Sequence, residues 1–211
     1  MKNNVTELVF IIDRSGSMAG FEEDTIGGFN ATLARQREKE GKVLVSTVLF
    51  NNESEVIHDR IDISEIEPMT KGDYTVFGCT ALLDAVGDAI KHIENIHKYA
   101  RDEDVPEHTV FVITTDGMEN ASRRYGQRQI KGKIKHKTEA CGWEFIFLAA
   151  NIDAAAEAEK IGIRRERAAN YKQTKDGVGR SYFAMSEAIM AVRERRPESV
   201  DLEGYLSQEE E

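Results

Sequence analysis

Three oxygen-bearing side chains follow the first apolar run of the chain at alternate positions. The run Leu8–Ile12 leads directly into Asp13, Ser15 and Ser17, within the sequence Asp-Arg-Ser-Gly-Ser. Carboxylate and hydroxyl oxygens gathered on one tight turn are the kind of ligands that hard cations such as Mg²⁺ take up. The alternative is that Asp13 or Ser15 caps a following helix, as both residue types often do. On this turn alone the two interpretations stay open.

Two further segments carry oxygens of the same kind. Asp116-Gly117 ends the strand-like segment that begins at Thr109, so a second carboxylate is expected at the same edge of the sheet. Thr80 precedes a long segment with helical spacing of apolar residues. It is either part of a site or the N-cap of that helix, with Asp84 as a first-turn acid near the positive end of the helix dipole. Together the three loops predict a metal site.

Alternating strand-like and helix-like segments must position these loops. Runs rich in β-branched and aromatic residues predict four strands of a mostly parallel sheet, Leu8–Ile12, Val43–Phe50, Thr109–Thr114 and Glu144–Ala150. Apolar residues at helical spacing predict helices around 26–33 and 82–93, and over Gln127–Cys141 and Tyr182–Val192. A short polar turn after Phe50 leads into Ser54–Ile61, which predicts a hairpin and one antiparallel edge strand. The predicted fold class is α/β, with helices on both faces of the sheet.

The size and composition of the chain fit a single domain. It has 211 residues, of which 40% are hydrophobic, which fits one sizeable core, whereas two independent domains would each be small. We assign residues 1–194 to this domain. Residues 195–211 change in composition and end in three consecutive glutamates, which predicts a solvated or loosely docked acidic tail.

The order and content of the three loops resemble the von Willebrand factor A (VWA) domain. Asp-x-Ser-x-Ser after the first strand, a Thr before a central helix and Asp-Gly after a later strand are similar to the metal-ion-dependent adhesion site (MIDAS) of that family. The resemblance covers about residues 5–193 and implies a three-layer, Rossmann-like fold. It also implies a divalent ion, Mg²⁺ or in its place Mn²⁺ or Ca²⁺. The implied metal site comprises Asp13, Ser15, Ser17, Thr80 and Asp116.

The same resemblance implies how the site works. Ser15 and Ser17 would bind the ion directly, Thr80 directly or through water, and Asp13 and Asp116 mainly through bound waters. Neutral hydroxyls leave the charge of the ion incompletely offset, so a further anionic oxygen is expected to complete its coordination. In the family, a partner protein supplies that oxygen from an Asp or Glu. The chain thus resembles a protein-binding module without catalytic turnover, of the intracellular type of bacteria and phages, and some such relatives work beside AAA-type ATPases.

The chief alternative is a magnesium-dependent phosphohydrolase of the haloacid-dehalogenase type. That family also begins with an Asp at the end of its first strand, but it needs a second Asp two residues later as a general acid. Here that position is Ser15, whose hydroxyl cannot replace a carboxylic acid in proton transfer near neutral pH. A dinucleotide-binding domain is disfavoured because no Gly-x-Gly-x-x-Gly opens the first helix, and the five histidines lack the spacing of a zinc enzyme.

Three charged features near the predicted site have more than one interpretation. Glu119 is an extra ligand, a substitute for the partner's carboxylate, or a loop residue that faces solvent. Arg14 either favours an acidic partner or is a plain surface arginine. The basic run from Arg123 to Lys137 is either a docking face for an acidic partner or nucleic acid, or a solvated helix, and the second interpretation is favoured.

Charge, cysteine content and hydropathy limit the remaining classes. Lys and Arg number 28 against 38 Asp and Glu, a formal net charge of −10, which disfavours binding to nucleic acids or anionic membranes. Cys79 and Cys141 are too few for a disulfide framework, and we expect both to be reduced and buried. The apolar run Val9–Ile12 is too short for a signal peptide or a membrane span, so the cytoplasm is the expected compartment.

Overall fold

A computed structural model describes residues 4–172 and 174–207, which form a six-stranded mixed sheet. The strands are β1 (Val5–Asp13), β2 (Lys42–Phe50), β3 (Ser54–Asp62), β4 (His108–Thr115), β5 (Glu144–Ala149) and β6 (Ala168–Asn170). Their order across the sheet is β3-β2-β1-β4-β5-β6, and every neighbouring pair is parallel except β2 and β3. The predicted parallel sheet and its antiparallel edge strand are both confirmed.

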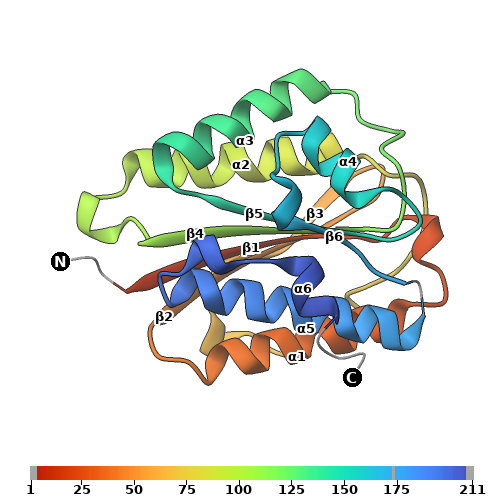
Figure 1. Cartoon of the computed structure of the whole chain (residues 1–211), viewed down its shortest axis with the longest axis horizontal. Coiled ribbons are helices and arrows are strands. Elements are labelled where there is room, and N and C mark those ends of the chain that lie inside the picture. Colours follow the sequence, from red (N-terminus) through yellow and green to blue (C-terminus); the bar gives the residue numbers. More distant parts are fainter. Residues whose placement is uncertain (1–3, 173, 208–211) are drawn as a thin grey trace.

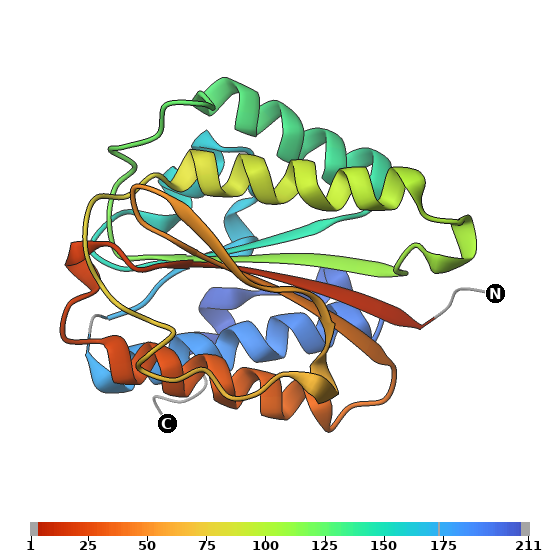
Figure 2. The same ribbon diagram turned by 180° about the vertical axis from the view of Figure 1, so that it is seen from behind.

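Helices cover both faces of this sheet, as Figures 1 and 2 show. The α-helices are α1 (Glu22–Arg37), α2 (Leu82–Tyr99), α3 (Gln127–Cys141), α4 (Ala154–Lys160), α5 (Lys175–Arg193) and α6 (Leu202–Ser207). Single 3₁₀ turns are η1 (Gly16–Met18), η2 (Ile63–Glu65), η3 (Asp102–Asp104), η4 (Arg165–Arg167) and η5 (Pro197–Ser199). Helices α2, α3 and α4 lie on one side of the sheet, and α1, α5 and α6 lie on the other. The architecture is therefore a three-layer α/β fold.

The two helical layers bury two separate apolar clusters against the sheet. Successive side chains of a strand point to opposite faces. Leu8, Phe10 and Ile12 of β1 accordingly pack with α1 and α5, whereas Val9 and Ile11 pack with α2 and α3. All five side chains are buried. This explains why the first strand is apolar at every position rather than at alternate ones, as expected for a strand inside a parallel sheet.

Strand β6 and helix α4 have no counterpart in the prediction. Strand β6 has only three residues, Ala168–Asn170, and helix α4 only seven, Ala154–Lys160. Both segments are too short to show a clear hydrophobic period. Tertiary packing specifies them instead, because β6 pairs with β5 at the edge of the sheet and Ala154 and Ala158 of α4 are fully buried.

The C-terminal segment, predicted to be a solvated or loosely docked tail, contains two short helical elements. Helix α6 and η5 lie within residues 195–211, and both pack onto the domain. Leu202 is fully buried, and the guanidinium of Arg167 donates a hydrogen bond from Nη1 to the backbone oxygen of Val200 at 2.7 Å. The tail is thus part of the folded body as far as residue 207, because a few apolar side chains anchor an otherwise acidic segment. Residues 208–211, with the terminal glutamates, lie outside the described residues.

The predicted burial of the two cysteines is wrong. Cys79 and Cys141 are both exposed and are not joined in a disulfide. Cys79 lies in the loop before α2, and Cys141 is the last residue of α3, directly before Gly142. The backbone of Gly142 is in the left-handed conformation, with a φ of 66°, which ends the helix and turns its last residues toward solvent. Among the residues that the structure describes, no helix is both long enough and apolar enough to span a membrane.

Candidate metal site

The predicted site lies at the carboxyl ends of two neighbouring strands. Strands β1 and β4 are parallel and in register, with Ile12 opposite Thr114, so Asp13 and Thr115 come next at the same edge. The chain leaves β1 toward β2 on one side, while β4 lies on the other side. In open α/β sheets the crevice at such a change of direction is where ligands bind. The fold therefore brings the first and third predicted loops together.

The loop after β1 carries three of the predicted side chains, and hydrogen bonds order them. The backbone N–H of Ser15 donates to Asp13 Oδ1 at 2.7 Å, and the hydroxyl oxygens of Ser15 and Ser17 lie 3.1 Å apart. The hydroxyl of Ser17 donates to Asp116 Oδ1 at 2.6 Å, which joins this loop to the one after β4. Asp13, Ser15 and Asp116 are buried, whereas Ser17 is exposed. The inner side of the predicted site is thus lined by buried groups, and its outer side is open to solvent at Ser17.

Asp13 is the most deeply buried of these residues, and neutral groups hold it. Thr115 donates its hydroxyl to Asp13 Oδ2 at 2.6 Å, and the hydroxyl of Tyr74 donates to the backbone oxygen of Asp13. Burial raises the pKa of the Asp13 carboxyl, hydrogen bonds from Thr115 and Ser15 lower it, and the negative charge of Asp116 raises it, so the net pKa lies above its ordinary value. A nearby cation would favour the charged form of this carboxylate.

Thr80 is the residue whose position the sequence left open between site and helix cap. Helix α2 begins at Leu82, and its N-cap residue is Ala81, which makes no side-chain hydrogen bond to the helix. The hydroxyl of Thr80 is therefore not the helix cap. A Cβ atom built on Gly117 would lie 3.5 Å from Thr80 Oγ1 and 3.4 Å from Ser17 Oγ. Both hydroxyls therefore face the small space above Gly117, and Thr80 lies beside the other predicted residues.

The donor atoms suit a hard divalent cation. Neighbouring ligands of an octahedral Mg²⁺ ion, each about 2.1 Å from it, are about 3 Å apart. The distance between the hydroxyl oxygens of Ser15 and Ser17 matches this value. Within residues 4–172 and 174–207, no three His, Cys, Asp or Glu side chains gather as a potential metal cluster. Any site at this edge must therefore rely on hydroxyls, and the residues present fit such an ion.

Thr115 and Tyr74 donate hydrogen bonds to Asp13, and sequence reasoning predicted neither contact. Thr115 directly precedes Asp116, and a polar residue at the end of a buried strand was a signal that could have found it. Tyr74 lies in the loop between β3 and α2, far from Asp13 in sequence, and no spacing rule links the two residues.

Two charged residues near the site have roles that the sequence interpretations did not include. Glu119 is half-buried, and its two carboxylate oxygens accept hydrogen bonds from the start of α2 and from its own loop. Arg14 is not a plain surface residue, since it is buried, pairs with Glu55 at 2.6 Å and lies against the ring of Phe77. Both charged groups therefore have partners within the domain.

Among the basic residues of the run 123–137, some form ion pairs within the domain and others face solvent. Arg124 forms ion pairs with Asp84 and Asp88, and Lys137 is buried, pairing with Glu94 at 2.8 Å. The Lys137 ammonium also lies 5.0 Å from the centre of the Trp143 ring. The remaining basic side chains of α3 are exposed or half-buried. Part of the run therefore stabilises the fold, which the sequence did not reveal.

The chain is similar to several solved structures at low sequence identity. A von Willebrand factor type A protein from Catenulispora acidiphila is 13% identical, with a TM-score of 0.54, over 90% of this chain and 43% of that one. The ArnB paralog VWA2 from Sulfolobus acidocaldarius is 15% identical, with a TM-score of 0.54, over 89% and 45%. Proximal thread matrix protein 1 from the mussel byssus, in a structure whose MIDAS motif is occupied by zinc, is 14% identical, with a TM-score of 0.54, over 90% and 45%. This chain spans less than half the length of each.

These likenesses define the fold class. The chain is an α/β domain whose loops gather hydroxyls and carboxylates at the carboxyl edge of a parallel sheet. Its fold is that of the VWA domain, as the resemblance implied. At the level of sequence, no protein-family model and no curated protein matches the chain.

A methyl group at Gly117 tests whether the space between the hydroxyls matters. The Cβ of Gly117→Ala would be in ordinary contact with Ser17 and Thr80, so we expect stability without metal to change by less than about 0.5 kcal/mol. Crowding of the site should cost about 1.4–2.8 kcal/mol of metal binding, roughly a tenfold to hundredfold loss of Mn²⁺ affinity by isothermal titration calorimetry.

The matched control for this substitution is Gly132→Ala in α3, where an added Cβ meets nothing within 4 Å. The control should leave Mn²⁺ affinity unchanged and stabilise the helix by about 0.5–1 kcal/mol. Equal affinity of Gly117→Ala and the unchanged chain would show that this space is not the metal site.

Proposed function

We propose that the chain is a metal-dependent protein-binding module. The proposal is that Asp13, Ser15, Ser17, Thr80 and Asp116 hold a divalent cation, with Mg²⁺ as the expected ion, and that the ion captures an Asp or Glu carboxylate of a partner protein. The observation that carries it is the convergence of hydroxyls from loops far apart in sequence on one small space beside buried carboxylates.

The ligand chemistry supports an anionic partner. Ser15, Ser17 and Thr80 would contribute neutral oxygens, so a bound cation would keep much of its charge. Ser17 is exposed, which leaves the outer side of the site open to another molecule. A carboxylate oxygen is the ligand that such a hard cation accepts most readily from a protein.

The surface around the site supports a protein as the partner. Phe77 and Met118 are large apolar side chains with 56% and 59% of their surface exposed. Phe77 lies three residues before Thr80 in the same loop, and Met118 follows Gly117. Exposed Phe and Met side chains are enriched at the centres of protein interfaces. We infer that they contact the partner on either side of the captured carboxylate.

A phosphohydrolase is the alternative that the site supports less well. Position 15 carries a hydroxyl, which cannot act as a general acid near neutral pH, and the second carboxylate of the proposed site, Asp116, accepts a hydrogen bond from Ser17. We therefore propose that the chain is not an enzyme. An AAA-type ATPase system is one partner class that the family resemblance suggests, and the acidic charge of the chain is unfavourable for binding to nucleic acids and anionic membranes.

The proposal is tested by capture with and without the metal. The immobilised chain is exposed to an extract of its native cells in Mg²⁺ or in EDTA, beside a Ser17→Ala variant. We expect a protein that is retained only in Mg²⁺ and only by the unchanged chain. Its purified form should then lose binding when one of its own acidic residues is replaced by Ala.

Two outcomes would contradict this function. Equal retention of the partner in EDTA would show that the ion plays no part. Hydrolysis of p-nitrophenyl phosphate in Mg²⁺ that disappears in Asp13→Ala would favour the phosphohydrolase instead.

A further inference from the structure

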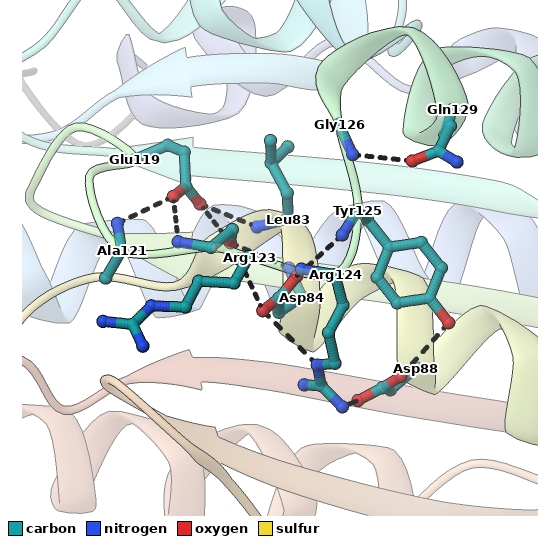
Figure 3. A network of polar contacts seen from close by, with 11 residues as sticks. Leu83, Asp84, Asp88, Glu119, Ala121, Arg123, Arg124, Tyr125, Gly126 and Gln129 are labelled. Atoms are coloured by element: carbon teal, nitrogen blue, oxygen red, sulfur yellow. Dashed lines mark hydrogen bonds and ion pairs between the residues drawn. The ribbon is translucent and has the colours of Figure 1, made fainter.

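Side-chain hydrogen bonds attach the loop between β4 and α3 to helix α2. This loop runs from Asp116 to Gly126 and lies against the first turn of α2, as Figure 3 shows. Two acidic side chains make this attachment, Glu119 from the loop and Asp84 from the helix. Neither belongs to the set of residues proposed to hold the ion.

Glu119 joins the loop to the start of α2. Its Oε2 accepts hydrogen bonds from the backbone N–H of Leu83 at 2.9 Å and from the hydroxyl of Ser122 at 2.8 Å. Its Oε1 accepts from the backbone N–H groups of Ala121 at 2.9 Å and Ser122 at 2.7 Å. The first N–H groups of a helix have no partner inside the helix, so Glu119 satisfies one that would otherwise be unpaired. Its negative charge also lies at the positive end of the α2 dipole.

Asp84 makes the reciprocal attachment from the helix to the loop. Its carboxylate accepts hydrogen bonds from three consecutive backbone N–H groups, those of Arg123, Arg124 and Tyr125, at 2.9 to 3.0 Å (Figure 3). Burial raises the pKa of the Asp84 carboxyl, but these hydrogen bonds lower it, and the net pKa lies below its ordinary value. The backbone N–H of Asp84 in turn donates to the hydroxyl of Ser122 at 3.0 Å. Loop and helix therefore hold each other through charge-assisted hydrogen bonds.

This attachment continues to Thr80. The backbone N–H of Thr80 donates to Asn120 Oδ1 at 2.9 Å, and the backbone N–H of Asn120 donates to the backbone oxygen of Thr80 at 3.0 Å. Asn120 is the immediate neighbour of Glu119, and Gly117 of the same loop lies beside the Thr80 hydroxyl. The position of Thr80 relative to Asp116 thus depends on how the loop is fixed to α2.

We propose that Asp84 and Glu119 are positioning residues of the metal site. They hold the loop of Thr80 and the loop of Asp116 in a fixed position relative to each other. The Thr80 hydroxyl and the Asp116 carboxylate are then in place before an ion binds. A site whose ligands are already ordered loses less conformational entropy when it binds, and removal of such outer supports costs metal affinity. This inference rests on the proposed function, because it concerns the same ion.

The test compares Asp84→Asn and Glu119→Gln with the unchanged chain, using Mn²⁺ as the probe. Each variant keeps the size of the side chain but weakens its hydrogen bonds to the backbone N–H groups. We expect Mn²⁺ affinity, measured by electron paramagnetic resonance, to fall about 10- to 100-fold. We also expect the water-proton relaxation rate per bound Mn²⁺ to rise, because a water takes the place of a displaced Thr80 hydroxyl.

A matched control is Asp88→Asn. Asp88 lies one turn along α2, pairs with the Arg124 side chain at 2.5 Å and accepts a hydrogen bond from the Tyr125 hydroxyl. It therefore touches the same loop, but through side chains only. The control should leave both Mn²⁺ affinity and relaxation rate unchanged. Ser122→Ala, which removes only one hydroxyl of the network, serves as a milder variant should Asp84→Asn or Glu119→Gln fold poorly, and should lower affinity less.

The outcomes separate this inference from the proposed function. Hydrogen exchange at the amides of residues 121–125 reports whether the attachment is loosened. Faster exchange there, with Mn²⁺ affinity and relaxation rate equal to those of the unchanged chain, would overturn the positioning role while the metal site stood. Failure of the unchanged chain itself to bind Mn²⁺ would overturn the proposed function and this inference with it.

Discussion

A chain carrying both Ser15→Ala and Thr80→Ala is expected to lose the thermal stabilisation that Mg²⁺ or Mn²⁺ gives to the unchanged chain. An ion at a hundred times its dissociation constant adds about 2.7 kcal/mol to folding stability. For a chain of 211 residues, this corresponds to a rise in melting temperature of about 5–10 °C. The two substitutions remove hydroxyls from two different loops, so the remaining groups cannot surround the ion. Differential scanning calorimetry with saturating metal and with EDTA measures the difference.

The control for this prediction is Ser54→Ala with Thr75→Ala, which removes two exposed hydroxyls outside the proposed site. Its melting temperature should still rise with the ion by the same amount as that of the unchanged chain. A double variant at Ser15 and Thr80 that kept the full rise would show that the ion binds elsewhere.

Replacement of Asp13 by Asn is expected to change metal binding and stability in opposite directions. Asp13 is fully buried, its hydrogen bonds come from neutral donors, and Asp116 adds a second negative charge nearby. Without an ion, the buried charge of Asp13 therefore lowers the free energy of unfolding of the chain. Asn has the same shape and no charge, so Asp13→Asn should gain roughly 1 kcal/mol in EDTA, about 2–4 °C in melting temperature. The same change should lower Mn²⁺ affinity about 10- to 100-fold.

This opposition of effects is a signature of a functional residue, because a site that needs charge is built at the expense of stability. Asp59→Asn, at an exposed position on β3, serves as the control and should alter neither metal affinity nor melting temperature appreciably. A lower melting temperature of Asp13→Asn in EDTA would show that the carboxylate stabilises the metal-free fold and would contradict this prediction.

Sequence and structure agree most closely where local patterns repeat over many residues. The apolar runs predicted strands β1, β2, β4 and β5, and helix α3 begins and ends at the predicted residues, Gln127 and Cys141. Gly126 before α3 and Gly142 after it are local signals that a sequence carries openly. Burial on both faces of the sheet requires continuous apolar strands, so this part of the fold was readable without coordinates.

The sequence alone determined which residue types stand at the ends of β1 and β4, and hence which oxygens the sheet would bring to one edge. Only the tertiary structure decided what supports them. Thr115 donates to Asp13, and Glu119 and Asp84 hold the Asp116 loop against α2. These contacts join residues far apart in the chain or accept backbone N–H groups, and backbone groups have no signature in a sequence. From the sequence alone, a loop carboxylate that binds an ion cannot be distinguished from one that faces water or caps a helix. Tertiary packing determines which partners it has.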